Sequence, residues 1–306
     1  MTKILIVGGQ GFIGSKVIDR AVSLGWDVTS LNSSYRPKDS ELRHAVRHLI
    51  ADISCKNSLD KALGLVEFDY VVNCSGYIDH SPFFSGGRRA IDMHFIGVLN
   101  LVESLNHRLL KSFVNIGSSD EYGDGQPPQA ESFRESAISP YSLAKAASSH
   151  FLQMMYRTEG FPSTTLRIFL TYGPGQDSKR FIPQVISGCL SNASFSASKG
   201  DQLRDFCYIS DIVEAIFATL HSPGAHGEII NIGSGVPVSV RQVIEKIRMI
   251  VGIGNPMYGN LPYRNGENMA LYANTTKAKQ VLGWDAKVSL ERGLENTIDW
   301  YRNSNE

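Results

Sequence analysis

The stretch that decides the fold of this chain is Ile-Leu-Ile-Val-Gly-Gly-Gln-Gly-Phe-Ile-Gly, residues 4–14. Its four leading apolar residues predict a strand that is buried on both faces of a sheet. Gly8, Gly11 and Gly14 then recur every third residue, and an apolar stripe predicts a helix over 12–24. This order is typical of a dinucleotide-binding fold, because a pyrophosphate can approach a backbone without Cβ atoms and meet the free amides of the helix N-terminus.

The glycine turn and the strand ends that follow supply the candidate contacts for the dinucleotide. The turn itself contributes Gly8, Gly11, Phe12, Ile13 and Gly14. A fold that prefers NAD usually has a carboxylate at the end of the second strand, whereas this chain has Asn32 there and Arg36 four residues on. This pair favours NADP as the cofactor, with NAD as the alternative if Asn32 bonds the ribose and Arg36 faces solvent. Asp52 and Ile53, which close the third strand, are expected to contact the adenine.

Short β-rich runs alternate with helical stretches through the first two thirds of the chain. We expect strands at about 4–7, 27–31, 48–51, 69–74, 112–117 and 164–170, with helices notably at 87–106 and 140–157. Strand and helix alternating in this way predict an α/β fold of the Rossmann type, with a doubly wound parallel sheet.

Beyond about residue 172, prolines punctuate shorter elements and the pattern loosens. We expect one strong helix there with Ser210 as its N-cap, a strand at 228–232, and a last helix at about 289–302. The organisation predicts a smaller, interleaved C-terminal part that binds the substrate. The expected division is 1–172 plus about 205–236 for the dinucleotide-binding domain, and 173–204 plus 237–306 for the substrate-binding part.

The composition excludes several classes of protein. Of the 306 residues, 42% are hydrophobic, which is enough for a core and rules out a disordered chain. Thirty basic residues balance thirty acidic ones, so a nucleic-acid partner is not expected. No apolar run approaches the roughly 20 residues that span a bilayer, and the N-terminus lacks a signal cleavage site. Four cysteines without metal-binding spacing complete the expectation of a cytoplasmic protein with no metal site and no membrane contact.

A serine, a tyrosine and a lysine form the second candidate site. Ser118 follows a strand at the carboxyl edge of the sheet, where open α/β sheets bind their ligands. Pro140 suits the first turn of the next helix, and Tyr141 and Lys145 lie four positions apart on one face of it. A nearby ammonium favours the phenolate, so Lys145 is expected to lower the pKa of Tyr141 while Ser118 hydrogen-bonds the reacting oxygen. Alone, such a Tyr–Lys pair is more often a surface pair; the serine and the glycine turn favour catalysis.

Together these motifs resemble the extended short-chain dehydrogenase/reductase family, whose members act on nucleotide sugars. The resemblance covers nearly the whole chain and includes Arg167, Tyr172-Gly173-Pro174-Gly175, Arg204-Asp205-Phe206-x-Tyr208-Ile209-x-Asp211, Arg264-x-Gly266-Glu267 and Leu282-Gly283-Trp284. It implies that Ser118, Tyr141 and Lys145 form the catalytic triad, with Tyr141 and Lys145 also touching the cofactor.

The resemblance also implies a nucleotide-diphosphate sugar as substrate. Arg204 and Arg264 would hold its diphosphate, because a guanidinium group forms paired hydrogen bonds with phosphate oxygens. The remaining candidate substrate contacts are Ser119, Asp120, Arg180 and Glu267.

Two positions depart from the pattern of the family. Leu170 stands where many relatives have asparagine, so a contact to the sugar or phosphate is expected to be missing. His94 stands in a His-x-x-Gly segment where Asn-x-x-Gly is usual, and it is expected to take over the structural role of that asparagine by bonding backbone near the serine strand.

Three reactions in the family share this triad: 4-ketoreduction, 4-epimerisation and 4,6-dehydration of the sugar. A dehydratase places carboxylates after its serine, and counted back from Tyr122 this chain offers only Ser119 and Asp120 there. The segments 117–123 and 262–264 look most like reductases of NDP-4-keto-6-deoxyhexoses. We therefore expect NAD(P)H-dependent reduction of such a sugar, with an epimerase or dehydratase of the same family as the alternative. A non-enzymatic, NADP-binding redox sensor is the second alternative.

Members of the family usually pair through the helices at about 87–106 and 140–157, so a homodimer is expected by resemblance. The candidate seam comprises Leu99, Leu101, Val102, Leu105, Phe151, Leu152 and Met155. Packing of these helices on their own sheet explains the same apolar spacing equally well.

Overall fold

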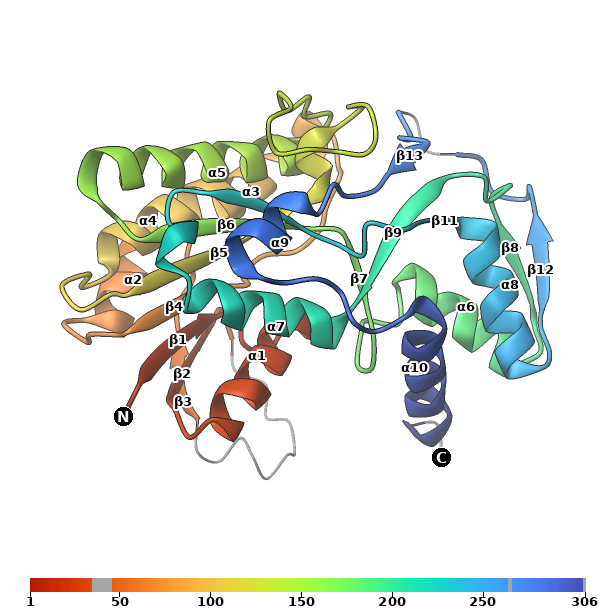
Figure 1. Ribbon diagram of the computed structural model, residues 1–306, viewed down its shortest axis with the longest axis horizontal. Helices are drawn as coiled ribbons and strands as arrows, with labels where there is room; N and C mark the ends of the chain where they lie inside the picture. The colour runs from red at the N-terminus through yellow and green to blue at the C-terminus, as the bar shows by residue number, and fades with distance from the viewer. Residues whose placement is uncertain (35–45, 264–265, 305–306) are drawn as a thin grey trace.

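A seven-stranded sheet dominates the computed structural model, which describes residues 1–34, 46–263 and 266–304 (Figure 1). The strands run in the order β10-β6-β5-β4-β1-β2-β3, and every neighbouring pair is parallel. Their bounds are β1 Lys3–Val7, β2 Asp27–Asn32, β3 Arg47–Ile50, β4 Tyr70–Asn73, β5 Ser112–Ser118, β6 Ser163–Ile168 and β10 Ile229–Ile232. The strand order reverses between β1 and β4, so a crevice for ligands is expected at their carboxyl ends.

Helices cover both faces of this sheet, and each face has its own apolar core. One core joins the sheet to α1 (Phe12–Ser23), α7 (Ile209–Leu220) and α9 (Thr276–Leu282). The other joins it to α2 (Lys56–Leu63), α4 (Gly97–Ser104) and α5 (Pro140–Glu159). The expected doubly wound α/β fold is therefore confirmed. Both faces must be covered because each inner strand carries apolar side chains on both of its sides.

A smaller part, at the right of Figure 1, packs beside the carboxyl edge of the sheet. Its second sheet has β9 (Leu203–Tyr208) at its centre, paired with β7 (Leu170–Tyr172), β11 (Pro237–Ser239) and β13 (Ala270–Leu271). Two further strands, β8 (Ser194–Ala197) and β12 (Asn255–Tyr258), form a separate pair. A third core holds α6 (Phe181–Leu190), α8 (Val240–Val251) and α10 (Leu290–Ser304) together.

Several element boundaries differ from the sequence expectation. The helix expected over 87–106 is divided into α3 (Arg88–Ile91), a π-helical turn η3 (Asp92–Ile96) and α4. The run expected as one strand over 164–170 breaks after β6, and its last residues pair with β9 in the second sheet. Ser210 was expected as an N-cap, but it is the second residue of α7, and Tyr208 occupies the cap position.

The expected division of the chain into two parts stays a prediction, and two segments cross it. α9 was expected with the substrate-binding part, yet its Ala278 and the following Trp284 pack in a core of the large sheet. β9 was expected largely with the dinucleotide-binding domain, yet it is the central strand of the second sheet.

The expected dimer seam is largely used inside the protomer. Leu101, Val102, Leu105 and Leu152 are buried in the core beneath α4 and α5, so they cannot form a surface seam. Phe151 and Met155 pack partly against the same core. A homodimer therefore remains a proposal, and of its expected seam only Leu99, Phe151 and Met155 are partly exposed.

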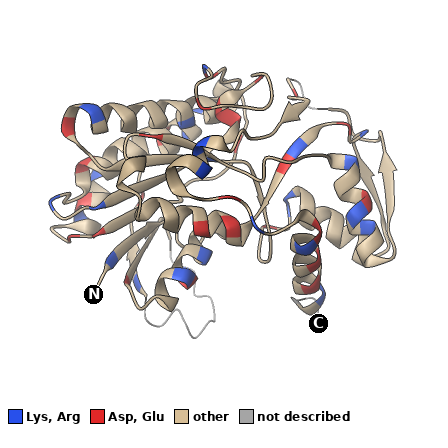
Figure 2. Ribbon diagram, in the orientation of Figure 1, with Lys and Arg blue, Asp and Glu red and all other residues tan. Residues whose placement is uncertain are grey.

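Charge and hydropathy agree with the composition of the chain. Figure 2 shows basic and acidic residues interspersed over both parts rather than gathered by sign. Across the described ranges, no helix combines the length and apolar character needed to cross a bilayer.

One buried carboxylate ties the two parts together. Asp205 on β9 is fully buried, and its oxygens accept hydrogen bonds from Ser234 N at 2.7 Å, Ser234 Oγ at 2.6 Å, Gly235 N at 2.9 Å and Ala273 N at 3.1 Å. Its partners lie after β10 and after β13, so three segments distant in sequence converge on one side chain.

We predict that Asp205→Asn lowers the free energy of unfolding by about 3 kcal/mol, because the new amide NH₂ faces donors and leaves buried N–H groups unpaired. Urea unfolding followed by circular dichroism measures the change. The matched control is Asp201→Asn at an exposed carboxylate that accepts a hydrogen bond from Tyr263, which should change stability by less than about 0.5 kcal/mol. Equal effects of the two variants would contradict the role given to Asp205.

Candidate functional site

The glycine turn between β1 and α1 is shaped to receive a phosphate group. Gly8 has φ +78°, and a Cβ atom there would come within 2.8 Å of the carbonyl oxygen of Cys74. A Cβ on Gly14 would overlap the carbonyl oxygen of Gly8. Gly11 occupies the N-cap of α1 and supplies no side-chain cap, which leaves the amides of Phe12 and Ile13 at an uncapped helix N-terminus. These five residues therefore fit a dinucleotide pyrophosphate, as the sequence predicts.

The next strand end holds Asn32 in a different way from the one expected. Its Oδ1 accepts a hydrogen bond from Gln10 N at 2.9 Å, and its Nδ2 donates to Ser30 Oγ at 2.9 Å. The buried amide thus braces the glycine turn against β2. Arg36, the other residue that favoured NADP, lies outside the described residues.

Of the two residues expected to contact adenine, one is exposed and the other is buried. Asp52 is exposed, and its Oδ1 accepts hydrogen bonds from both the amide and the hydroxyl of Ser54. Ile53 is buried in the core between the sheet and α4, where its carbonyl accepts a hydrogen bond from Asn100. Of the two, Asp52 has the accessible side chain at this edge.

The serine, tyrosine and lysine meet at the carboxyl end of β5. Ser118 is the last residue of that strand, while Tyr141 and Lys145 lie in the first two turns of α5, and all three are buried. The helix begins there because Ser139 caps it and Pro140 occupies its first turn. Ser118 hydrogen-bonds the Tyr141 hydroxyl, and Lys145 Nζ donates to the Ile116 carbonyl at 2.6 Å.

The ionisation of Tyr141 differs from the sequence expectation. Its pKa is raised, not lowered, because burial disfavours the phenolate and the Asp120 and Glu121 carboxylates add to this. Ser118, by its hydrogen bond, and the Arg180 guanidinium, by its charge, act in the opposite sense. The expectation that Lys145 makes the phenol acidic is therefore wrong for the protein without ligands, since burial of the hydroxyl outweighs the surrounding cations.

Burial acts on Lys145 as well and lowers its pKa to about 8. The charge of Glu121 opposes this fall. The amine is therefore a group that exchanges its proton near neutral pH, while the phenol beside it keeps its own.

Two histidine rings pack against Tyr141. The His94 ring meets it edge to face at 4.9 Å, and the His80 ring does so at 5.5 Å. His94 Nε2 lies 2.8 Å from the carbonyl of Tyr77, after β4, so the expected backbone contact is present one strand away from the serine strand. Burial, with the Lys145 charge adding to it, lowers the pKa of His94 to about 3. The ring is therefore neutral and serves to hold Tyr141 in place.

The candidate substrate residues fall into two groups. Near Tyr141 lie Asp120, whose carboxylate is 3.5 Å from His80 Nε2, and Arg180, which precedes α6 and acts on the phenol through its charge. Ser119 is buried beside Ser118.

The second group lies on the smaller part of the protein. Arg204 on β9 forms an ion pair with Glu267, so the structure brings together two residues that the sequence separates by more than sixty positions. Arg264 lies outside the described residues. Leu170, on β7, is exposed.

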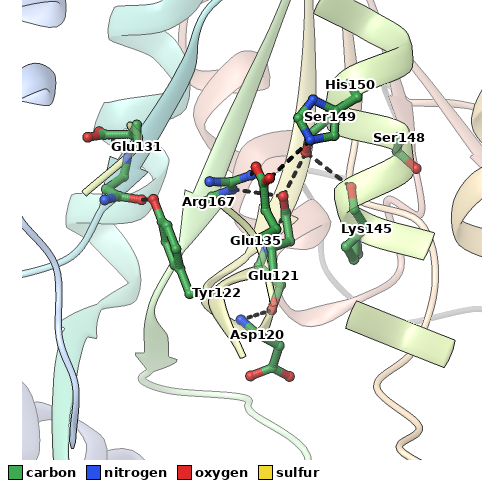
Figure 3. Close-up of polar contacts among 12 residues, drawn as sticks. Asp120, Glu121, Tyr122, Glu131, Glu135, Lys145, Ser148, Ser149, His150 and Arg167 are labelled. Atoms are coloured by element: carbon green, nitrogen blue, oxygen red, sulfur yellow. Dashed lines mark hydrogen bonds and ion pairs between the residues drawn. The ribbon is translucent and has the colours of Figure 1, made fainter. Parts of the chain in front are cut away.

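Sequence reasoning did not identify the partners of Glu121. This carboxylate is fully buried, accepts a hydrogen bond from Ser118 N at 2.9 Å, and pairs with the buried Arg167 (Figure 3). The signal was present, because Ser118 and Glu121 have the Ser-x-x-Glu spacing of a capping box. Arg167 was noted only as a family match, without a partner.

Residues 4–233 match the NAD dependent epimerase/dehydratase family. The structure of UDP-glucose 4-epimerase with UDP-glucose from Thermotoga maritima is similar over 100% of both chains, with 28% identity and a TM-score of 0.92. MoeE5 in complex with UDP-glucuronic acid and NAD is similar over 99% of each chain, with 26% identity and a TM-score of 0.88. The dTDP-glucose 4,6-dehydratase of Xanthomonas campestris pv. campestris (strain B100) is 28% identical over 97% of this chain and 92% of its own.

This chain belongs to the NAD dependent epimerase/dehydratase family. The resemblance inferred from the sequence is thereby confirmed, and so is the expectation of an enzyme of the oxidoreductase type. In this member of the epimerase/dehydratase family, the glycine turn after β1 and the residues around Tyr141 lie at the same carboxyl edge of the sheet.

We predict that Gly14→Ala weakens binding of the dinucleotide to this family member at least about tenfold, because its Cβ would displace the Gly8 carbonyl and distort the turn. Quenching of tryptophan fluorescence by NADH or NADPH measures the affinity. Gly224→Ala is the matched control, since a Cβ there meets no atom within 4 Å. Unchanged affinity in Gly14→Ala would show that the turn does not hold the cofactor.

A second prediction concerns the pH dependence of stability. The unfolded chain binds a proton at residue 94 below about pH 6.5, whereas the folded protein keeps His94 neutral down to a pKa of about 3. The stability contributed by the neutral ring is therefore complete above pH 6.5 and is lost as the pH falls towards 3. Between pH 7 and 4.5 the wild-type protein should lose about 2–3 kcal/mol more than His94→Asn, measured by urea unfolding. Equal losses of stability in the wild-type protein and in His94→Asn would contradict a buried neutral ring.

Proposed function

We propose that this enzyme transfers hydride from NAD(P)H to C4 of a nucleotide-diphosphate 4-keto-6-deoxyhexose and so produces a deoxysugar nucleotide. The observation that carries the proposal is the position of Tyr141, which is buried at the carboxyl end of β5 and hydrogen-bonded to Ser118. Burial together with Asp120 and Glu121 raises the pKa of this phenol, so it holds its proton at neutral pH. Reduction of a ketone needs a proton donor at the developing alkoxide, and a buried protonated phenol is suited to that task.

Each residue of the triad has a separate task in this proposal. Tyr141 donates its proton to the oxygen at C4, and Ser118, already hydrogen-bonded to the phenol, positions the same oxygen. Lys145 orients the cofactor ribose through its ammonium group. The cofactor, when bound, supplies the hydride. The His94 ring against Tyr141 limits rotation of the phenol, so the proton stays directed at one place.

The smaller part of the protein would hold the nucleotide end of the substrate. Arg204 and Arg264 are the proposed ligands of the diphosphate, with Glu267 beside them. The Arg204–Glu267 ion pair supports this assignment, because it keeps a half-buried guanidinium oriented by a partner that a diphosphate can outcompete with two charges. Ser119, Asp120 and Arg180 are proposed contacts of the sugar, since Asp120 and Arg180 act on the phenol through their charges and Ser119 follows Ser118.

The relatives support a nucleotide sugar as substrate and also favour a second reaction. UDP-glucose and UDP-glucuronic acid are bound in two of the similar structures, and one of those proteins is a 4-epimerase. A 4-epimerase of this family is therefore the second candidate. A 4,6-dehydratase of the family belongs to the same alternative and is supported by the dTDP-glucose 4,6-dehydratase among the relatives, although the buried Ser119 stands where a dehydratase has its first carboxylate.

The choice between NADP and NAD is proposed from two opposing observations. Asn32 is neutral and does not repel a 2′-phosphate, which favours NADP. NAD is the cofactor in the MoeE5 complex, and the amide of Asn32 is engaged with Gln10 instead of facing solvent. The affinities for NADPH and NADH, measured side by side, decide between them.

We predict that Tyr141→Phe lowers kcat by at least about a hundredfold while the affinity for the cofactor stays unchanged, since only the proton donor is removed. The assay follows oxidation of NADPH and NADH at 340 nm with CDP-, GDP-, UDP- and dTDP-4-keto-6-deoxyhexoses, and NMR identifies the product. One cofactor oxidised per sugar supports the reductase. With UDP-glucose, which has a hydroxyl at C4, formation of its C4 epimer without net oxidation of the cofactor supports the epimerase. Cofactor binding without turnover of any of these sugars supports a redox sensor.

A further inference from the structure

A buried cluster of charged residues lies next to the triad and has no role in the proposed reaction. Glu121 has no exposed surface, and each of its oxygens is used. Oε1 accepts a hydrogen bond from Ser118 N at 2.9 Å, while Oε2 accepts from Arg167 Nε at 2.7 Å and from Ser149 Oγ at 2.9 Å. Figure 3 shows this carboxylate between Arg167 and the helix that carries Lys145 and Ser149. Burial of a carboxylate costs free energy, so we expect a fully buried and fully paired carboxylate next to Ser118 to have a role in the site.

Glu121 fixes the position of Ser118. Its amide is held by Glu121, and its own hydroxyl accepts a hydrogen bond from Asp120 N at 3.2 Å, so both ends of the residue are fixed. The approach of the carboxylate depends on Gly117, because a Cβ there would come within 2.7 Å of Glu121 Oε1. The turn after β5 is thus built around this one side chain.

Glu121 also lies among the groups that surround the charge of Lys145. The groups that face its ammonium come from four elements: the Ile116 carbonyl on β5, Glu121 on η4 (Ser119–Tyr122), Cys74 after β4, and His94 on η3. On α5 itself, Tyr141 lies one turn away, and Ser149 bonds both Glu121 and the Lys145 carbonyl.

Only one of these groups opposes the ammonium with a negative charge at neutral pH, within the part of the chain that the structure describes. Burial raises the pKa of the Cys74 thiol to about 12 and lowers that of His94 to about 3, so both are neutral. The pKa of Tyr141 is raised as well, which leaves the phenol neutral. Glu121, paired with Arg167, remains as the carboxylate that raises the pKa of Lys145 against its burial.

We infer that Glu121 is a positioning residue of the active site, which fixes Ser118 through its amide and, linked through Ser149 to the backbone of Lys145, places a negative charge near the buried Lys145 ammonium. This inference rests on the proposed function for the tasks of Ser118 and Lys145. It explains how an amine can be buried beside a neutral phenol and still meet the cofactor as a cation.

The other side of Arg167 supplies a matched control. Glu135 also pairs with this arginine, and its second oxygen lies 3.1 Å from His150 Nε2 at the surface. Loss of the Glu135 charge disturbs the same buried guanidinium, but Glu135 is not among the groups that contact Ser118 or act on Lys145. A purely structural role of Glu121 would therefore be reproduced by Glu135→Gln.

The test is a titration of Lys145 by NMR in protein labelled with ¹³Cε-lysine, with the signal assigned by its loss in Lys145→Met. The wild-type protein should titrate with a midpoint near the pKa of about 8, and Glu121→Gln should move that midpoint to lower pH by about one unit. Glu135→Gln should leave it in place. An unmoved midpoint in Glu121→Gln, or an equal shift in both variants, overturns the inference.

Because loss of one member of a buried ion pair can unfold a protein, Glu121→Asp provides a second variant. It keeps the charge, so the Lys145 midpoint should stay close to the wild-type one, but its shorter side chain cannot bridge Arg167 and Ser118. The Ser118 amide should then exchange its hydrogen at least about tenfold faster, measured by NMR in D₂O. Unchanged exchange overturns the positioning role.

Failure of the proposed function would appear elsewhere. A wild-type protein that binds neither NADH nor NADPH would refute that function, while the titration of Lys145 in the free protein would still decide the role of Glu121.

Discussion

Removal of water from the ionisable groups at the end of β5 is the constraint on which the rest of the site depends. Ser118, Tyr141 and Lys145 are all buried there, and burial by itself favours the neutral form of each titratable group. It raises the pKa of the phenol, and it lowers the pKa of the amine to about 8 although the Glu121 carboxylate opposes that fall. The site therefore has to hold a proton donor and a cation within two turns of one helix, and it does so by placing negative charge beside the amine.

The fold supplies the means for this arrangement. The parallel sheet brings the ends of β1, β4 and β5 to one edge, so the glycine turn and the serine lie at the same edge although more than a hundred residues separate them. Arg167 contacts Glu121 from the neighbouring strand β6, and the helix α5 contributes Ser149 and Lys145. Asp205 then fastens the smaller part, with its arginine, to this edge.

The features that could be predicted from the sequence are those that depend on residues close together in the chain. The apolar run of β1, the three glycines and the cap of α5 each depend on neighbouring residues, so the turn and the start of the catalytic helix could be read directly. The raised pKa of Tyr141 could not, because it comes from burial by distant segments. The transfer of Leu170–Tyr172 to the second sheet likewise depends on pairing with β9, more than thirty residues away. Ser210 shows the opposite case, in which a good capping residue lies one position inside the helix that it was expected to begin.

The π-helical turn at Asp92–Ile96 has a consequence for the relation between α3 and α4. A wider turn accommodates one additional residue, and each residue rotates a helix by about 100°. The wider turn therefore shifts the phase between α3 and α4: His94, within the turn, points its ring towards the phenol, while Val98 and Leu101, after it, lie in the core. Insertions or deletions along 88–104 would change that phase, so the length of this segment is constrained even at positions where the identity of the side chain is not.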